Sequence, residues 1–423
     1  MLQVSYIREN RDKVLDRLAV RNFKQPELVD QIIRTDEDRR KTQAELDSIS
    51  AEANSAAKQI GDLMRQGKKD EAEAIKAKTA AFKEQTKALS EKLASLEAQL
   101  QTEIVLLPNL PHTSVPTGAT ADDNVVALEH GEKPALPETA LPHWELAAKY
   151  DIIDFELGNK ITGAGFPVYK GKGARLQRAL INFFLDNAQE AGYREMQVPI
   201  LVNEASGFGT GQLPDKEGQM YHVGIDNLYL IPTAEVPVTN LYRDVIVKEE
   251  ELPIRNCGYT PCFRREAGSY GAHVRGLNRL HQFDKVEIVQ IAHPDQSYEI
   301  LEQMSTYVQS LLQKLELPYR VLSLCGGDMG FTSAKTYDME VWCAAQARWL
   351  EVSSVSNFET YQSNRLKLRF KGKEGKPQLA HTLNGSALAL PRIVASLLEN
   401  NQTEQGIRIP AALVPYTGFD YID

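Results

Sequence analysis

Residues 261–291 read PCFRREAGSYGAHVRGLNRLHQFDKVEIVQI, and this segment says more about the architecture than any other part of the chain. Two strand-like ends flank a long polar loop, so the segment predicts two strands that the loop connects. Because side chains alternate between the faces of a strand, Arg264 and Glu266 should share one face of the first strand. The same rule groups a set on the second strand: Arg279, His281, Phe283, Lys285 and Glu287.

This set of side chains is unsuited to a hydrophobic core, because it combines cations, an aromatic ring and carboxylates. It suits a phosphate clamp, a stacking platform and a receptor for an ammonium group. Phe283 and Glu287 lie about 13 Å apart along a strand, which fits an adenosine joined through phosphate to an amino acid. A salt-bridged surface hairpin explains a lone Arg–Glu pair more simply, but it does not explain the whole set.

Outward from this segment, residues 146–423 predict one α+β domain. Helical stretches at 173–191 and 297–315 do not alternate regularly with the strand-like runs, which favours a mainly antiparallel sheet flanked by helices. No glycine-rich nucleotide motif follows a strand, so a nucleotide site must be built otherwise. The strand-like runs are 228–231, 285–291, 319–324, 337–342 and 366–370.

The region from about 27 to 105 predicts a long antiparallel two-helix coiled coil. Its spacing of mostly apolar positions is that of a heptad seam, interrupted by a glycine-containing break at 65–69. Each arm should project about 55–60 Å. The seam positions are Leu28, Ile32, Thr35, Arg39, Thr42, Leu46, Ile49, Ala53, Ala56, Ile60, Leu63, Ile75, Thr79, Phe82, Thr86, Leu89, Leu93, Leu96 and Leu100.

The hairpin has an uneven charge, because basic side chains outnumber acidic ones between 58 and 92 in a chain of net charge −9. A solvated coiled-coil surface is the simpler explanation for most such runs. The alternative is an arm that lies along a phosphate backbone. Under that alternative, Lys68, Lys69 and Lys76 are the expected contacts with nucleic acid.

Composition sets the class of protein. The 423 residues are 42% hydrophobic and 25% charged, which excludes a disordered, collagen-like or membrane-spanning chain. No secretory signal is visible, and four cysteines are too few for a disulfide scaffold, so we expect a cytoplasmic protein. We expect an N-terminal helical domain at 1–107, a proline-rich linker or surface loop at 108–145 and the α+β domain at 146–423.

A structural zinc site is not expected. Cys257 and Cys262 are separated by four residues, a spacing that leaves zinc open, but buried free thiols are the simpler interpretation. Four histidines show no spacing typical of metal ligands, namely His112, His130, His143 and His222.

Four segments together resemble class II aminoacyl-tRNA synthetases, specifically the seryl-tRNA synthetases. Residues 261–291 resemble motif 2 of that class, and 382–402, TLNGSALALPRIVASLLENNQ, resemble motif 3 with Arg392 where a strand enters a helix. Residues 180–202, LINFFLDNAQEAGYREMQVPILV, resemble motif 1 with its proline at Pro199. Residues 231–240, IPTAEVPVTN, resemble the serine-binding loop of the family. With the hairpin, the resemblance covers essentially the whole chain.

The resemblance implies an ATP site. Arg264 would hold the α-phosphate, Glu266 the adenine amino group and Phe283 one face of the adenine ring. Arg392 would cover the other face and reach the γ-phosphate, and Glu351 with Ser354 would hold Mg²⁺ on the phosphates. Arg264, Arg392 and Glu351 are the implied catalytic residues. The full implied ATP set is Arg264, Arg265, Glu266, Arg279, Phe283, Glu351, Val352, Ser353, Ser354 and Arg392.

The resemblance also implies a serine pocket and a contact with tRNA. Arg275 would help to hold the acceptor end of the tRNA. Without the resemblance, Thr233 reads as an N-cap, Glu235 as part of a first helical turn and Ser386 as a strand hydroxyl bonded to backbone. The implied serine-binding set is Thr233, Ala234, Glu235, Arg264, Glu287, Asn384 and Ser386.

The implied function is activation of L-serine with ATP and transfer of the seryl group to tRNA(Ser), and also to tRNA(Sec), by a homodimer. Two alternatives stay open: a related ligase that loads a small amino acid on a carrier protein, and a catalytically inactive tRNA-binding relative. Three residues depart from the usual family pattern, namely Arg265 in motif 2 and Ala387 and Pro391 in motif 3. They leave open how closely the backbone approaches ATP.

Overall fold

A computed structural model describes residues 1–266, 274–373 and 375–423. Residues 267–273, which belong to the polar loop of the segment 261–291, lie outside the described residues. The chain forms two compact units. The first comprises Met1–Ala19 and Phe23–Pro108, and the second comprises Val20–Asn22 and Asn109–Asp423.

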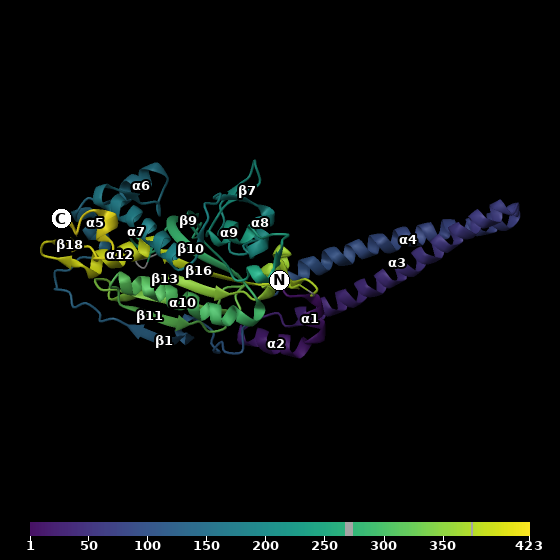
Figure 1. Cartoon of the computed structure of the whole chain (residues 1–423), viewed down its shortest axis with the longest axis horizontal. Helices are drawn as coiled ribbons and strands as arrows, with labels where there is room; N and C mark the ends of the chain where they lie inside the picture. Colours follow the sequence, from purple (N-terminus) through teal and green to yellow (C-terminus); the bar gives the residue numbers. More distant parts are fainter. Residues whose placement is uncertain (267–273, 374) are drawn as a thin grey trace. The chain divides into compact units, whose positions relative to one another are not determined.

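The first unit is helical, and its main feature is the coiled coil of α3 (Glu27–Arg65) and α4 (Lys69–Ile104) (Figure 1). The heptad prediction is confirmed, because every seam position is buried or half-buried while most positions between them are exposed. The helices reverse direction at Gly67, whose φ of 73° favours glycine because a side chain is strained there. Two short helices, α1 (Val4–Glu9) and α2 (Arg11–Val20), precede the hairpin.

A buried carboxylate lies near the base of α3. Asp36 is 1% exposed and accepts hydrogen bonds from Arg8 Nη1 at 2.5 Å and from Arg39 Nη2 at 2.7 Å. Next to it, Gln99 of α4 donates a hydrogen bond of 3.3 Å to the buried hydroxyl of Thr35. The weakest apolar stretch of the predicted seam is therefore held by polar contacts between the helices.

The second unit is built on an eight-stranded sheet of the described residues. Its strands pair antiparallel apart from β4 and β9, so the predicted α+β fold with a mainly antiparallel sheet is confirmed (Figure 1). In spatial order the strands are β1 (Val125–His130), β11 (Tyr319–Ser323), β12 (Lys335–Cys343), β13 (Arg348–Asn357), β16 (His381–Ala389), β10 (Gln282–Ala292), β9 (Ile254–Phe263) and β4 (Arg194–Glu195).

Three helices cover one face of this sheet: α7 (Gly171–Glu190), α10 (Ser297–Lys314) and α12 (Leu390–Asn400). Their apolar side chains share a core with alternate residues of the strands, such as Leu383 and Ala387 of β16. Because side chains alternate along a strand, Asn384 and Ser386 lie on the opposite face. That opposite face carries the polar residues described below.

Short elements complete the second unit. They are α5 (His143–Lys149), α6 (Phe155–Ile161), α8 (Glu204–Thr210), α9 (Glu235–Asn240), α11 (Thr360–Leu366), α13 (Val414–Thr417), β2 (Ile153–Asp154), β3 (Val168–Tyr169), β5 (Leu201–Asn203), β6 (His222–Val223), β7 (Leu228–Leu230), β8 (Ile246–Lys248), β14 (Arg369–Lys371), β15 (Gln378–Leu379), β17 (Gln402–Thr403), β18 (Gly406–Arg408) and β19 (Tyr421–Ile422). Among all the described helices, none is both long and apolar enough to cross a membrane.

Three local predictions are wrong. The second strand of the segment 261–291 is β10, which begins at Gln282, so Arg279 and His281 precede it and do not belong to its alternating set. The expected strand at 366–370 is shortened to Arg369–Lys371, because Leu366 ends helix α11 with its side chain fully buried. The first strand of the segment 261–291 ends at Phe263, so Arg264 and Glu266 follow the strand and alternation does not govern them. Glu266 instead has a left-handed backbone with φ of 49°.

Candidate active site

A cavity of about 520 Å³ opens on the polar face of the sheet, a size typical of a site for a small molecule. Strands β10, β13 and β16 supply its floor, and the segments around Arg264 and before α9 supply its walls. The structure brings most of the predicted site residues together here. Those that line the cavity are Thr233, Glu235, Arg264, Glu266, Arg279, Phe283, Glu351, Val352, Ser353, Ser354, Asn384, Ser386 and Arg392.

Of the site residues predicted between 146 and 423, four do not line the cavity: Ala234, Arg265, Arg275 and Glu287. Ala234 is fully buried ahead of helix α9. Arg275 is exposed, and its guanidinium lies 4.8 Å from the centre of the Trp144 ring. Glu287 is buried beneath the cavity and acts on it through its neighbours, as described below.

Arg264 and Phe283 form a cationic and aromatic end of the cavity. The guanidinium carbon of Arg264 lies 5.2 Å from the centre of the Phe283 ring, within the range of a cation–π contact. Arg264 Nε donates a hydrogen bond of 3.3 Å to the carbonyl of Pro232, which anchors the side chain. An anchored guanidinium can bind two phosphate oxygens at once, and the exposed part of the Phe283 ring can stack on a base.

Glu266 and Arg279 meet at the rim of the cavity. Arg279 Nε donates to Glu266 Oε2, and the backbone N–H of Glu266 donates a hydrogen bond of 3.1 Å to the side-chain carbonyl of Gln219. Glu266 follows β9 and Arg279 precedes β10, so both residues line the cavity from outside the strands on which alternation had placed them.

Arg392 is held in place by backbone carbonyls. Its Nε donates to the Asn278 carbonyl at 3.0 Å, and its Nη1 donates to the Glu351 carbonyl at 2.6 Å. It lies in the first turn of α12, directly after Pro391. Proline is favoured at the start of a helix, so this departure from the family pattern supports the position of Arg392.

Oxygen ligands for a divalent cation gather beside Arg392. Glu351 is exposed, and Ser354 lies on the same strand opposite Asp338 of β12. The buried Oδ1 of Asp338 has no hydrogen-bond partner among the described residues. Burial and the nearby charge of Glu351 raise the pKa of the Asp338 carboxyl well above its ordinary value. Such crowded carboxylates with an unpaired oxygen fit Mg²⁺, which prefers hard oxygen ligands.

Glu287 is the centre of the opposite end of the cavity. Its Oε1 accepts a hydrogen bond of 2.6 Å from the Thr233 hydroxyl, and its Oε2 accepts one of 2.8 Å from Asn384 Nδ2. Lys285 forms an ion pair with the same carboxylate. Because Glu287 itself has no exposed surface, it orients Thr233 and Asn384, which line the cavity. Its direct contact with a ligand stays a prediction.

Glu235 adds a second carboxylate to this end. It is nearly buried, and its Oε1 accepts a hydrogen bond of 2.6 Å from Gln362 Nε2. Burial, which this hydrogen bond opposes, raises the pKa of the Glu235 carboxyl to about 7, and the charge of Glu287 contributes to the rise. Glu235 begins α9, and its N–H donates to the Thr233 hydroxyl at 3.2 Å, so Thr233 serves both the helix and Glu287.

The lysines predicted to contact nucleic acid lie around the turn of the hairpin. Lys68 pairs with Glu71 at 3.6 Å and Lys76 pairs with Glu73 at 2.6 Å, and all these side chains are largely exposed. Lys69 is exposed at the first position of α4. These geometries fit both a solvated surface and an arm for nucleic acid, so the geometry alone does not choose between them.

Sequence reasoning missed several residues that shape the site. Gln362 was assigned no role, although it holds Glu235. Lys285 was grouped with the ligand-facing set of the second strand but was left out of the expected serine-binding residues, although it pairs with Glu287 two residues away. His143 was set aside for lack of metal spacing, yet it lies fully buried beside Glu399. The partners of Gln362 and His143 are distant in the chain, so local spacing carried no signal for these two residues. The four cysteines, two of which were weighed for zinc, are free and buried.

The fold and the cavity define a class II aminoacyl-tRNA synthetase. The model of the tRNA synthetase class II core domain (G, H, P, S and T) matches residues 221–401, and the model of the seryl-tRNA synthetase N-terminal domain matches residues 1–111. With these matches and the relatives that follow, the chain belongs to the seryl-tRNA synthetases.

The relatives match along their whole lengths. The serine–tRNA ligase of Salinibacter ruber is 55% identical over 421 residues, which cover 99% of this chain and 98% of that protein. The serine–tRNA ligase of Akkermansia muciniphila is 49% identical over 100% of this chain and 99% of its own. The crystal structure of seryl-tRNA synthetase from Pyrococcus horikoshii complexed with ATP is 33% identical, with a TM-score of 0.94 over 100% of this chain and 99% of that one.

Proposed function

We propose that this chain is a serine–tRNA ligase, which activates L-serine with ATP and transfers the seryl group to the 3′ end of tRNA(Ser). The observation that carries the proposal is the composition of one cavity. Arg264 and Phe283 suit a nucleotide at one end, and Thr233, Glu235 and Asn384 suit a small polar amino acid at the other. The family of the chain supports the same conclusion.

The first step joins serine to AMP. A carboxylate oxygen of serine attacks the α-phosphorus of ATP, a new P–O bond forms, and the bond to the β-phosphate breaks to release pyrophosphate. No side chain need act as a nucleophile. Arg264 stabilises the negative charge on the α-phosphate, and its anchor on the Pro232 carbonyl keeps it in position before the substrate binds. In the second step, the terminal ribose hydroxyl of tRNA attacks the serine carbonyl, and AMP leaves.

The remaining nucleotide contacts are assigned by position. Phe283 stacks on adenine, and Glu266 accepts from the adenine amino group while Arg279 neutralises its charge. Arg392 covers the adenine and reaches the γ-phosphate. Glu351 and Ser354 would hold Mg²⁺ on the phosphates, where it supplies charge neutralisation when bound, and Asp338 lies beside them.

The end of the cavity assigned to serine is suited to select an amino acid with a side-chain hydroxyl. Asn384 and Ser386 line the cavity with an amide and a hydroxyl, and Thr233 is fixed by its hydrogen bond to Glu287. A site that hydrogen-bonds a substrate hydroxyl strongly rejects the analogue without it, because its polar groups would be left unpaired. Alanine should therefore be activated poorly. The ionised form of Glu235 suits the serine ammonium.

The first 107 residues form the tRNA-binding domain in this proposal, and residues 146–423 form the aminoacylation domain. The hairpin of α3 and α4 contacts the tRNA through Lys68, Lys69 and Lys76, and Arg275 contacts its acceptor end. Charging of tRNA(Sec), a homodimer assembled through the motif 1 region and a cytoplasmic location complete the proposal. Sedimentation of the purified chain tests the dimer.

The decisive experiment is ATP–pyrophosphate exchange with serine, threonine, alanine and glycine, on the wild type, Arg264→Ala and Arg264→Lys. We expect exchange driven by serine, abolished in Arg264→Ala and partly retained in Arg264→Lys, which keeps the charge but loses the fork of donors. Exchange with another amino acid alone would overturn the serine assignment. Absence of exchange in a well-folded wild type would favour the inactive tRNA-binding relative.

A further inference from the structure

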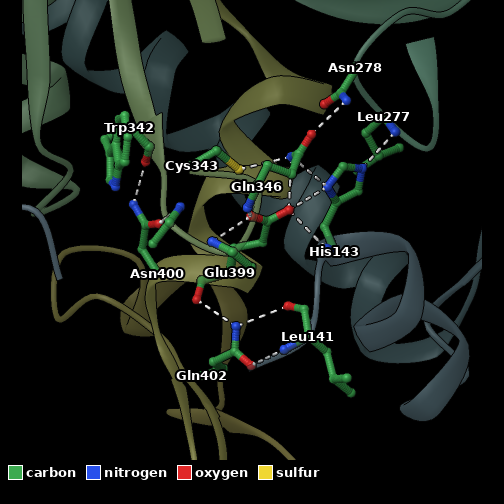
Figure 2. A network of polar contacts seen from close by, with 12 residues as sticks. Leu141, His143, Leu277, Asn278, Trp342, Cys343, Gln346, Glu399, Asn400 and Gln402 are labelled. Carbon is green, nitrogen blue, oxygen red and sulfur yellow. Dashed lines mark hydrogen bonds and ion pairs between the residues drawn. The ribbon is translucent and has the colours of Figure 1, made fainter. Parts of the chain in front are cut away.

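A buried polar cluster lies outside the cavity, at the point where α5, α12 and the turn between β12 and β13 meet (Figure 2). Its members are His143 at the start of α5, Cys343 at the end of β12, Gln346 in the turn and Glu399 near the end of α12. His143, Cys343 and Glu399 have no exposed surface. A buried polar group is costly unless it is hydrogen-bonded, so the partners of this cluster indicate what it does.

Glu399 is the acceptor at the centre of the cluster. Its Oε1 accepts from the backbone N–H of His143 at 2.9 Å, from His143 Nδ1 at 2.8 Å and from Gln346 Nε2 at 2.9 Å. Its Oε2 accepts from the backbone N–H groups of Ala345 at 3.0 Å and Gln346 at 3.1 Å. Burial opposes ionisation, but the hydrogen bonds from His143 and Cys343 keep the pKa of Glu399 below its ordinary value. The charge is thus stabilised by protein donors.

The donor set does not favour a metal centre. Possible ligand atoms of His143, Cys343 and Glu399 lie within 4.8 Å of one another, which is close enough for a shared metal ion to be considered. However, the backbone N–H of Leu277 donates to His143 Nε2 at 2.9 Å, so Nε2 carries no proton and Nδ1 carries the proton donated to Glu399. Both ring nitrogens are then engaged, and a metal would have to break one of these hydrogen bonds.

The cluster holds the segment Leu277–Asn278 from one side. His143 accepts from the backbone of Leu277, and the Gln346 side-chain carbonyl accepts from Asn278 Nδ2 at 2.8 Å (Figure 2). Gly276 makes this approach feasible, because a Cβ there would lie 2.3 Å from His143 Nε2 and its φ is 67°. Both residues of the segment also line the cavity.

The same segment holds Arg392 from the other side. The Asn278 carbonyl accepts a hydrogen bond from Arg392 Nε at 3.0 Å. Asn278 therefore connects the cluster to Arg392, a side chain assigned to ATP. Arg392 and Glu399 are seven residues apart on α12, which places them on one face of the helix. Helix α12 therefore carries both Arg392, which is assigned to ATP, and Glu399, the carboxylate at the centre of the cluster that holds Arg392 in place.

We propose that His143, Gln346 and Glu399 are positioning residues for the ATP end of the site, acting through Leu277–Asn278 on Arg392. The inference rests on the proposed function, and it adds a cluster outside the cavity that supports nucleotide binding. The geometry at the serine end depends on other contacts, namely those of Thr233 and Asn384 with Glu287. Disrupting the cluster should therefore weaken ATP binding and leave serine binding unchanged.

The test uses two matched substitutions of His143 in the full-length chain. His143→Asn places an amide nitrogen near the position of Nδ1, so it keeps a donor to Glu399 and loses the acceptor for Leu277. His143→Gln places an amide oxygen near the position of Nε2, so it keeps that acceptor and loses the donor. Gln346→Met removes the hydrogen bond between Gln346 and Asn278. Because Gln346 is only half-buried, this variant replaces the His143 variants in the test if one of them fails to fold.

Pyrophosphate exchange gives the KM for ATP, the KM for serine and kcat, and thermal unfolding gives Tm. We expect His143→Asn and Gln346→Met to raise the KM for ATP about five- to tenfold, the effect of one lost hydrogen bond, with the serine KM within about twofold of wild type. His143→Gln should raise the ATP KM less than His143→Asn, whatever their Tm values.

Asn400→Ala is the control, because Asn400 joins α12 to Ala344 of the same turn and to Trp342 of β12, and among the described residues it makes no hydrogen bond with Leu277 or Asn278. It should lower Tm and leave the ATP KM unchanged. Equal rises in both KM values, or effects that follow Tm alone across all four variants, would overturn the inference. A wild type that shows no serine-dependent exchange would instead overturn the proposed function, so the two failures are distinguishable.

Discussion

Thr233 donates a hydrogen bond of 2.6 Å from its hydroxyl to Oε1 of Glu287, a carboxylate without exposed surface. The two residues are far apart in the sequence, one ahead of α9 and the other in β10. Asn384 Nδ2 and Lys285 supply the other partners of this carboxylate. Glu287 thus fixes two groups that face the cavity. Under the proposed function, selectivity for serine would then depend on a residue that the substrate need not touch.

Removal of the Thr233 hydroxyl should weaken serine binding. Thr233→Val keeps the shape of the side chain but leaves Glu287 Oε1 one donor short in a buried place. We expect the serine KM to rise about tenfold or more, with the ATP KM nearly unchanged, in pyrophosphate exchange. Thr233→Ser keeps the donor and should remain within about threefold of wild type. An equal loss in both variants would contradict the role of the hydroxyl.

The KM for serine should fall as pH rises through 7. The pKa of Glu235 is raised to about 7, so its carboxyl is largely neutral at pH 6 and ionised at pH 8, whereas serine keeps its ammonium throughout. The ionised form attracts that ammonium. Exchange assays from pH 6 to 8 should show this dependence, and Glu235→Gln should flatten it while raising the KM at pH 8. An unchanged pH profile in the variant would assign the dependence to another group.

The same carboxyl should make the fold less stable at higher pH. Its pKa in the folded chain is raised above the unfolded value, so the folded state binds the proton more tightly. The resulting stability is fully present below the unfolded pKa of Glu, about 4.3, and is lost as pH rises through about 7. The loss is on the order of 3 kcal/mol. Thermal unfolding at several pH values should show a smaller decline in Glu235→Gln.

The tip of the hairpin should affect tRNA and not serine activation. Replacing Lys68, Lys69 and Lys76 together with alanine removes three cations from an exposed turn. We expect the KM for tRNA in the charging reaction to rise about tenfold near 0.1 M salt, with a weaker salt dependence. Pyrophosphate exchange without tRNA should stay at the wild-type rate. The matched triple arginine variant keeps the charge and should charge tRNA normally, and equal loss in both would contradict an electrostatic contact.

Asp36 should stabilise the base of the hairpin. Asp36→Asn keeps the shape but removes the charge that Arg8 and Arg39 share, so we expect a loss of about 1–3 kcal/mol. Circular dichroism of the full chain should show a lower Tm for the helical signal. Asp38→Asn, at an exposed position two residues on, is the control and should change little. A similar loss in both would indicate a general effect of charge.

The long helices were predictable because a heptad seam is a local pattern. Even Thr35 and Thr42, weak members of that seam, proved to be fully buried. The strand order of the large sheet was not predictable, since β1 pairs with β11 across nearly two hundred residues of intervening chain. Spacing in the sequence carries no information about which distant strands become neighbours.

In the candidate site, the residue types were predictable and their geometry was not. Alternation placed Glu287 on a ligand-facing surface, but its side chain has no exposed surface, and Thr233 and Asn384 from other segments bond its carboxylate. A single strand cannot reveal neighbours that come from other segments. His143 shows the same limit, because the hydrogen-bond partners of its ring lie more than a hundred residues away in the chain.

Amide hydrogen exchange should reveal the contacts of Glu399 as one cooperative unit. The N–H groups of Ala345 and Gln346 end on its Oε2, that of His143 on its Oε1, and that of Leu277 on the ring of His143. These donors come from three separate segments and meet on one carboxylate, either directly or, for Leu277, through the ring of His143. Opening one segment should therefore weaken the others. Their amides should exchange at a common rate and slow together when ATP binds, so that segments without a shared secondary structure unfold as if they were one.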